Sequence, residues 1–173
     1  MAITIRGRRQ EEGSRGFTLL IAMIFVGVVL AFAATLGALG YKQSILAGNA
    51  IQSQYAFYAA DAGLECLLYN DQGPSQDLFD YANAGTQDVS ASCNGTSYTY
   101  TVLAYTPTYW ALEAAQVAAA TSTSCADLTV YKYASTQSDG KTTYLFSQGY
   151  NLPCGAVTAG NGRLVARGLE AAY

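Results

Sequence analysis

The stretch SRGFTLLIAMIFVGVV (residues 14–29) places a basic segment directly against an apolar run. The run continues without a charged residue over residues 17–41, and 13 of these residues are Leu, Ile, Val or Phe. As a helix with a rise of ~1.5 Å per residue, it is roughly 37 Å long, enough to cross a hydrocarbon core of about 30 Å. A helix buried in a water-soluble domain would show a polar face, and this run has none. The sequence therefore predicts a helix that enters a membrane.

The charges are unevenly distributed around this run. Before Phe17, four arginines accompany two glutamates, whereas after it five Lys or Arg accompany ten Asp or Glu. Because basic residues stay on the cytoplasmic side of a membrane, we expect the N-terminus inside and the C-terminal part outside. The acidic remainder argues against nucleic acid as a partner.

Two ordinary kinds of membrane segment could account for the run. A secretory signal would have a shorter apolar core and a cleavage site of small residues, for which Ala31-Phe32-Ala33 could serve, but the apolar character continues to Tyr41. A single-pass anchor that presents a small exterior binding domain is the second alternative. Both remain open on composition alone.

A third interpretation rests on a resemblance. GFTLL after a basic leader resembles the N-terminus of type IV prepilins and type II secretion pseudopilins. In that family a prepilin peptidase cuts after the glycine and methylates the new N-terminal residue, which the resemblance assigns to Gly16 and Phe17. The resemblance also implies that the chain passes from the cytoplasmic membrane, through a pilus assembly platform, to other pilin subunits that it contacts by its N-terminal helix.

One position departs from the family pattern. The family usually carries a glutamate at the fifth mature position, which is Ile21 in this chain. A carboxylate in hydrocarbon costs a few kcal/mol unless it is paired, and in the family its partner is thought to be the N-terminal amine of a neighbouring subunit. The members that lack this glutamate are certain minor pilins and the pseudopilin at the filament tip. The resemblance therefore implies a minor subunit, for which a tip or initiating role is one option.

Helical spacing continues through residues 42–70, which contain no proline. The predicted buried stripe comprises Ile51, Tyr55, Tyr58, Ala59, Ala62, Cys66 and Tyr69. The turn-forming residues 70–74 end the helix. Asp61 and Glu65 lie one turn apart, and we expect them on the solvent face rather than as a catalytic pair.

The C-terminal part changes to a pattern typical of strands. The segments rich in Tyr, Thr, Val and Leu are residues 97–105, 127–134, 142–150 and 163–172. The dipeptides Asp139-Gly140 and Asn161-Gly162 are hairpin-type turns. We expect a short helix within residues 75–84 and either another helix or a loop insertion in the Ala-rich residues 109–120, where Trp110 is the aromatic residue to test for partner binding.

Four widely spaced cysteines, Cys66, Cys93, Cys125 and Cys154, indicate disulfides. None has CxxC spacing and the chain has no histidine, so we expect no metal site. If the hairpin turn centres near residue 138, antiparallel pairing places Cys125 opposite about residue 151, close to Cys154. Cys66 is then left for Cys93, although two other pairings and free thiols stay open. Such bridges persist only outside the reducing cytosol.

These features predict an α+β, pilin-like fold in which a long N-terminal helix packs on a small antiparallel sheet. The expected segments are a cytoplasmic leader (1–16), a transmembrane or filament-core half of the helix (17–41), an amphipathic half (42–70) and an extracytoplasmic sheet domain (71–173). The sequence contains no nucleophile–base pair, phosphate loop or cofactor motif, so we expect neither an enzyme nor a cofactor. The expected function is a minor subunit of a type IV pilus or pseudopilus, located in the cytoplasmic membrane and then at the cell surface.

Overall fold

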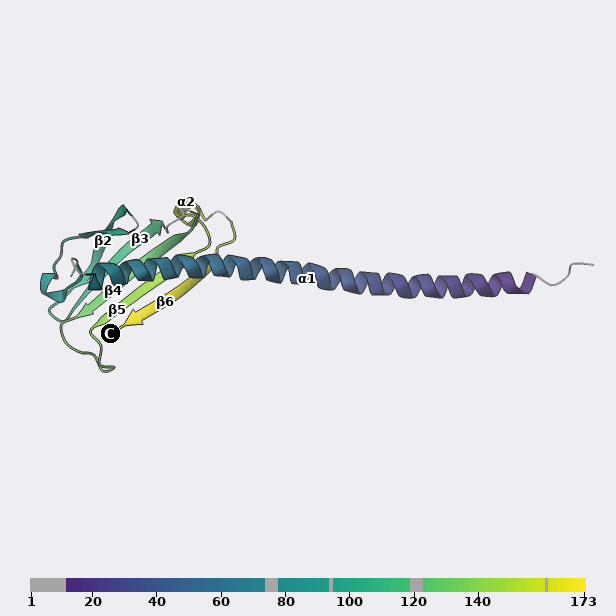
Figure 1. The fold of residues 1–173 in the computed structure, drawn as a ribbon, viewed down its shortest axis with the longest axis horizontal. Helices are drawn as coiled ribbons and strands as arrows, with labels where there is room; N and C mark the ends of the chain where they lie inside the picture. The colour runs from purple at the N-terminus through teal and green to yellow at the C-terminus, as the bar shows by residue number, and fades with distance from the viewer. Residues whose placement is uncertain (1–11, 74–77, 94, 119–122, 161) are drawn as a thin grey trace, which may run out of the picture. The chain divides into compact units, whose positions relative to one another are not determined.

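The computed structural model describes residues 12–73, 78–93, 95–118, 123–160 and 162–173 (Figure 1). The chain divides into two compact units, Met1–Gly48 and Asn49–Tyr173. The helix α1 (Glu12–Gln72), 61 residues long, has residues in both units. It begins earlier than the expected Phe17 and ends shortly after the expected Asn70. Most of the predicted leader, residues 1–11, lies outside the described residues.

The second unit contains a six-stranded antiparallel sheet with the strand order β1-β2-β3-β4-β5-β6. Its strands are β1 (Val89–Cys93), β2 (Thr96–Tyr105), β3 (Tyr109–Ala118), β4 (Cys125–Tyr133), β5 (Thr143–Tyr150) and β6 (Ala166–Ala172). Because strands that follow each other in sequence are neighbours in the sheet, the topology is an antiparallel meander. The α+β prediction is confirmed: the end of α1 packs on one face of this sheet (Figure 1).

Strand β3 corrects one prediction, because residues 109–118 form a strand and not a helix. Ala, Leu, Glu and Gln favour helices by intrinsic propensity. The backbone of this segment instead pairs with β2 on one side and β4 on the other. Trp110, Leu112 and Ala114 alternate along the strand and are buried in the core, so tertiary pairing overrides local propensity. Trp110, only 1% exposed, is a core residue and not a partner-binding residue.

Two connections also differ from the predictions. Within the described part of residues 75–84, the structure has only the 3₁₀ turn η1 (Tyr81–Asn83), which Asp80 caps by accepting a hydrogen bond from the Ala82 backbone N–H at 3.0 Å. The connection between β5 and β6 contains the short helix α2 (Cys154–Ala159), which was not predicted, and Asn161 of the predicted turn lies outside the described residues. The hairpin between β4 and β5 does turn at the predicted place, where Gly140 has a left-handed φ of 84°.

The end of α1 meets the sheet through small side chains. The buried residues at this contact include Ala56, Ala59, Ala60, Gly63 and Leu67. The predicted stripe is therefore right only in part: Ala59 is buried and Ala62 and Cys66 are half-buried, but Tyr55, Tyr58 and Tyr69 are 56%, 64% and 61% exposed. The cause is the close approach of helix and strand, since a Cβ atom placed on Gly149 of β5 would lie only 2.8 Å from the Ala59 carbonyl carbon. Beside Gly149 large side chains cannot enter the contact, so Tyr55 and Tyr58 lie on the exposed face of the helix, whereas Leu67, further along, is fully buried.

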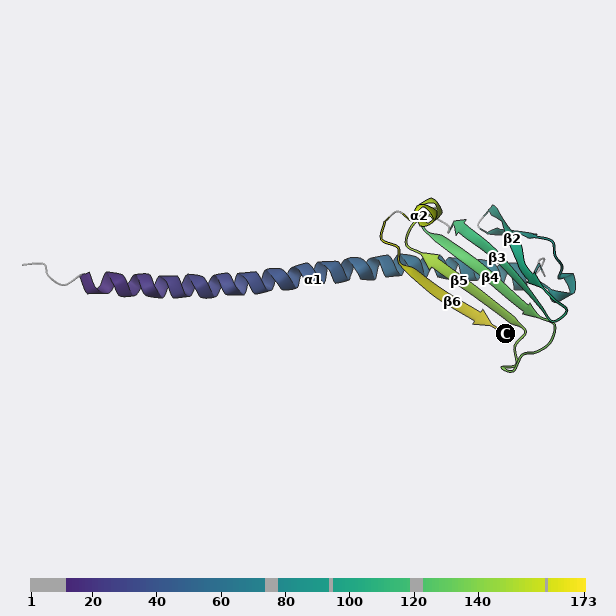
Figure 2. The ribbon, with the colours of Figure 1, turned by 180° about the vertical axis from the view of Figure 1, so that it is seen from behind.

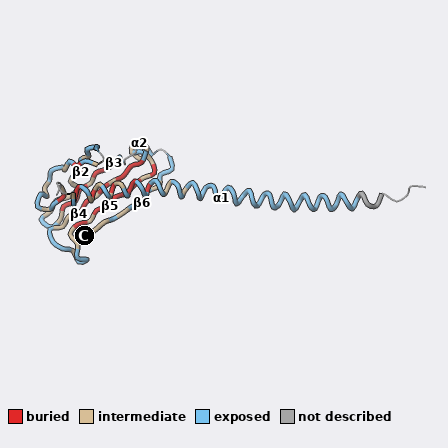
Figure 3. Tube along the Cα trace, in the orientation of Figure 1, coloured by how far each residue is buried: buried red, intermediate tan, exposed pale blue. Residues whose placement is uncertain are grey.

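Burial is concentrated in the second unit (Figure 3). The strands contribute most of a core that includes Tyr100, Leu128, Val130 and Leu145, all fully buried. In the first unit, every residue from 16 to 48 is exposed. Among the residues that the structure describes, the chain therefore buries a core for its sheet and leaves the first part of its helix uncovered.

Candidate functional site

The predicted processing and assembly residues lie in the first part of α1. Gly16, Phe17 and Ile21 are all helical, and the Phe17 and Ile21 side chains are 67% and 51% exposed. The most apolar window of this helix has a mean hydropathy of 2.8 and none of it is buried within the chain. By length and composition the helix can cross a membrane. An apolar segment of this kind at the N-terminus points to membrane insertion or secretion.

Two disulfides hold the second unit together. Cys66 of α1 pairs with Cys93 of β1 across 27 residues, and Cys125 of β4 pairs with Cys154 of α2 across 29 residues. Their Cα atoms are 5.7 and 4.9 Å apart, within the range for disulfides. In the β4–β5 register Cys125 lies opposite Tyr150, one position from the predicted residue 151, so the pairing is the one that the hairpin argument favoured. Both bridges point to an extracytoplasmic unit.

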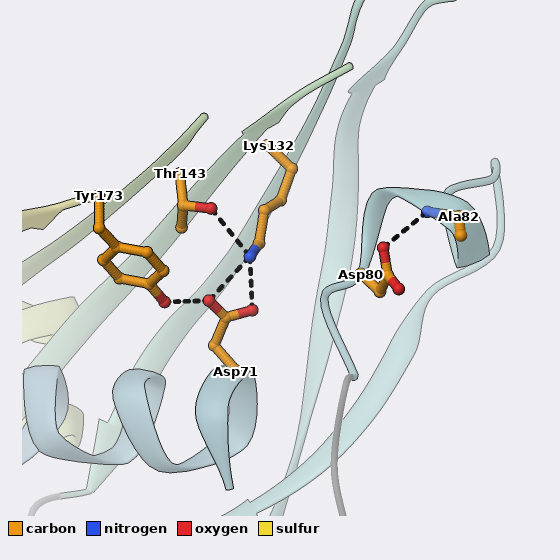
Figure 4. Close-up of polar contacts among 6 residues, drawn as sticks. All are labelled: Asp71, Asp80, Ala82, Lys132, Thr143 and Tyr173. Atoms are coloured by element: carbon orange, nitrogen blue, oxygen red, sulfur yellow. Dashed lines mark hydrogen bonds and ion pairs between the residues drawn. The ribbon is translucent and has the colours of Figure 1, made fainter. Parts of the chain in front are cut away.

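A buried ion pair lies where α1 ends (Figure 4). The side chains of Asp71 and Lys132 are only 3% and 12% exposed. The Lys132 ammonium donates to both Asp71 carboxylate oxygens, at 2.6 and 2.7 Å, and to the Thr143 hydroxyl at 3.0 Å. The Tyr173 hydroxyl also donates to Asp71. The ion pair therefore connects the end of the helix to β4, to β5 and to the last residue of the chain.

Asp71, Lys132, Thr143 and Tyr173 form what we call the structural lock, because their contacts hold the end of α1 on the sheet. Burial, together with the hydrogen bond to Asp71, raises the pKa of the Tyr173 hydroxyl above its ordinary value. The Tyr173 backbone also pairs with Thr143, whose N–H donates to the Tyr173 carbonyl at 2.9 Å. Sequence reasoning missed the cluster because Asp71 and Lys132 are 61 residues apart. Its one local signal was a lysine in an otherwise uncharged stretch, residues 128–138.

The carboxylates Asp61 and Glu65 lie on the exposed face of α1, as expected. Within the described ranges, no cluster of three or more His, Cys, Asp or Glu side chains could hold a metal ion. The predicted residues form two separate groups: Gly16, Phe17 and Ile21 belong to the first unit and the four cysteines to the second.

The comparisons with known proteins add no relative: no protein-family model, curated protein or solved structure matches the chain. The architecture is nevertheless pilin-like. A long, apolar N-terminal helix packs by its second part on an antiparallel sheet, and disulfides hold the sheet unit together.

Proposed function

We propose that the protein is a minor subunit of a type IV pilus or a related pseudopilus, processed by a prepilin peptidase between Gly16 and Phe17. One observation carries this proposal: residues 16–48 of α1 are exposed throughout, whereas the same helix ends inside a disulfide-bonded domain. Lipid covers the exposed apolar surface before assembly, and the helices of other subunits cover it afterwards.

The same apolar helix surface contacts lipid in the membrane and other helices in the filament. Lipid tails and packed apolar helices are similarly apolar, so the transfer from membrane to filament needs little exposure of residues 17–41 to water. Ile21 supports a minor role, because it offers no carboxylate to the N-terminal amine of a neighbouring subunit. A subunit without this pairing suits a filament tip or an initiation complex, where it has a neighbour on one side only.

The folded unit would transmit force between the helix and the exterior. Cys66–Cys93 fixes α1 to β1, and the Asp71–Lys132 pair fixes the end of α1 to β4. A helix pulled along its axis would have to break a covalent bond and a buried ion pair before it left the sheet. These two attachments support a mechanical, associative function.

The alternative function is a single-pass anchor that presents a small exterior binding domain, and Ile21→Glu separates it from a filament subunit. Ile24→Glu is the matched control, because Ile24 is likewise apolar and 60% exposed in the same part of α1. The amounts of each variant in the membrane and in the sheared filament fraction of the native host are compared with wild type.

In a filament subunit, Ile21→Glu changes the ratio of filament to membrane protein, whereas Ile24→Glu only lowers the amount inserted. In an anchor, both variants lower insertion and neither changes a filament fraction. An unchanged filament level for Ile21→Glu would contradict the role proposed for Ile21.

A further inference from the structure

The sheet face opposite α1 carries an aromatic cluster, which consists of Tyr109, Tyr131, Tyr133, Tyr144 and Phe146. In the view from behind, strands β3 to β6 lie in front of α1 with α2 only at one end (Figure 2). Ring centroids are 6.0 Å apart for Tyr109–Tyr133, 5.7 Å for Tyr133–Tyr144 and 5.8 Å for Tyr131–Phe146. All five side chains are half-buried, so part of every ring faces solvent.

Alternation along the strands assigns this cluster to the outer face. Lys132 of β4 points to Asp71 on α1, and a Cβ on Gly149 of β5 would meet the α1 backbone. Because neighbouring residues of a strand point to opposite faces, Tyr131 and Tyr133 point away from α1, and so do Tyr144 and Phe146.

Carboxylates flank the aromatic cluster. The strand register places Glu113, Thr129, Phe146 and Glu170 in one row across β3 to β6. With neighbouring strands ~4.8 Å apart, the two glutamates of this row are roughly 14 Å apart, on either side of the Phe146 ring. A hollow of about 350 Å³ lies over the row, lined in part by Glu113, Asp127, Phe146, Gln148, Gly168 and Glu170.

The basic groups nearby are mostly directed elsewhere. Lys132 is paired with Asp71 on the helix side, and Arg167 donates to Ser53 of α1 at 2.7 Å. Asp127 accepts hydrogen bonds from the Gln116 backbone N–H and the Tyr150 hydroxyl, at 2.8 and 2.7 Å. Glu113 and Glu170, by contrast, accept no hydrogen bond from any residue that the structure describes. Two carboxylates without hydrogen-bond donors among the described residues therefore lie beside partly exposed aromatic rings.

We propose that this face binds a cationic segment of a partner protein, with an arginine or lysine side chain against the aromatic rings and its charge between Glu113 and Glu170. Cations bind the faces of Tyr and Phe rings, and carboxylates supply charge-assisted hydrogen bonds. The second unit as a whole carries a net negative charge, which complements a cationic partner: it has four Lys or Arg against ten Asp or Glu. This inference does not depend on the proposed filament function.

The ring geometry favours a cation over a neutral sugar. Tyr131–Phe146 and Tyr133–Tyr144 meet edge to face, at interplanar angles of 83° and 82°. Rings that meet edge to face do not form the flat platform on which a sugar ring stacks; the third pair, Tyr109–Tyr133, is tilted by 32°. In an edge-to-face pair, the face of one ring stays free of the other ring. A guanidinium group can lie against that face while it reaches a carboxylate.

Binding of a fluorescent hexaarginine peptide to the full chain in zwitterionic detergent micelles tests the proposal. The double variant Glu113→Gln/Glu170→Gln should weaken binding about tenfold, equivalent to roughly 1.4 kcal/mol. The control Asp61→Asn/Glu65→Gln removes two carboxylates from the exposed face of α1 and should weaken binding less than about twofold. Equal weakening by both double variants would mean general electrostatic attraction and would overturn the proposal.

A second pair of variants tests the rings. Phe146→Leu should weaken hexaarginine binding several-fold, whereas Tyr55→Leu, on the exposed face of α1, should leave it unchanged. Circular dichroism of each variant checks that the fold is intact. Absence of binding to the wild-type chain would overturn the proposal. So would binding of a neutral oligosaccharide that Phe146→Leu abolishes and the glutamate variants leave intact, because it would show a sugar site.

Discussion

The two parts of α1 belong to one continuous helix but relate differently to the rest of the chain. Residues 16–48 are exposed over their whole length, although they are the most apolar part of the protein. In residues 49–72, small side chains such as Ala56 and Ala60 are fully buried, while large ones such as Tyr58 are exposed. Apolar character alone therefore does not decide what is buried in this helix. Close contact with the sheet decides it: among the described residues, the second part of α1 packs on the sheet and residues 16–48 are exposed.

This contrast is tested most severely by Lys132→Met, which leaves Asp71 buried without its counter-charge. We expect the free energy of unfolding of the sheet unit to fall by about 3–5 kcal/mol. Urea unfolding of the full chain in micelles, followed by near-ultraviolet circular dichroism, measures it. Lys42→Met, in the exposed part of α1, is the control and should change this value by less than about 0.5 kcal/mol. Similar effects of the two variants would contradict the structural lock.

The disulfides sharpen the comparison, because only one of them involves α1. Replacing Cys66 and Cys93 with Ala should lower the free energy of unfolding by roughly 3–4 kcal/mol on the chain-entropy model. Replacing Cys125 and Cys154 should cost nearly the same, since the two loops have almost equal lengths of 27 and 29 residues. Hydrogen exchange should separate them: only the first pair of substitutions should speed exchange at the end of α1. Equal exchange in both variants would refute the attachment of α1 by Cys66–Cys93.

A smaller effect is expected from the close contact between helix and sheet. Gly149→Ala would place a Cβ against the backbone of α1 and should destabilise the unit by about 1–3 kcal/mol, measured by urea unfolding. Gly168→Ala, in the adjacent strand β6, has open space around its Cβ and should stay within about 0.5 kcal/mol of wild type. A neutral Gly149→Ala variant would mean that α1 does not approach β5 so closely.

The smallest effect concerns alkaline pH. Desolvation and the hydrogen bond to Asp127 raise the pKa of Tyr150 to about 12, from an unfolded value near 10. Because the folded state holds this proton more tightly, its contribution to stability is complete below pH ~10 and is lost as the pH rises toward 12. Tyr150→Phe should therefore reduce the slope of stability against pH in this window, measured by urea unfolding at several pH values. An unchanged slope would contradict the role of the Tyr150–Asp127 bond.

Much of the fold could be predicted from local patterns in the sequence. The apolar run defines the first part of α1, and Asp139-Gly140 fixes a hairpin register that brings Cys125 near Cys154. The helix stripe could be predicted only in part, because small and aromatic residues both recur with helical spacing, and the close contacts of Gly63 and of Gly149 on a distant strand decide between them. Strand β3 was missed for a similar reason, since its two neighbouring strands override its helix propensity.

The candidate sites also differ in whether the sequence alone can reveal them. Gly16, Phe17 and Ile21 form a contiguous motif that can be recognised in the sequence without any structure. The Asp71–Lys132 pair and the row of Glu113, Phe146 and Glu170 join distant segments, so they become visible only when the strand register is known.

The mature N-terminus tests the central claim most directly. Intact-mass analysis of the protein purified from its own membrane should give a chain that begins at N-methylated Phe17. That result would establish prepilin processing and make filament assembly the working function. A chain that begins at Met1, as in a plain anchor, or directly after Ala33, as in a secreted protein, would contradict the account.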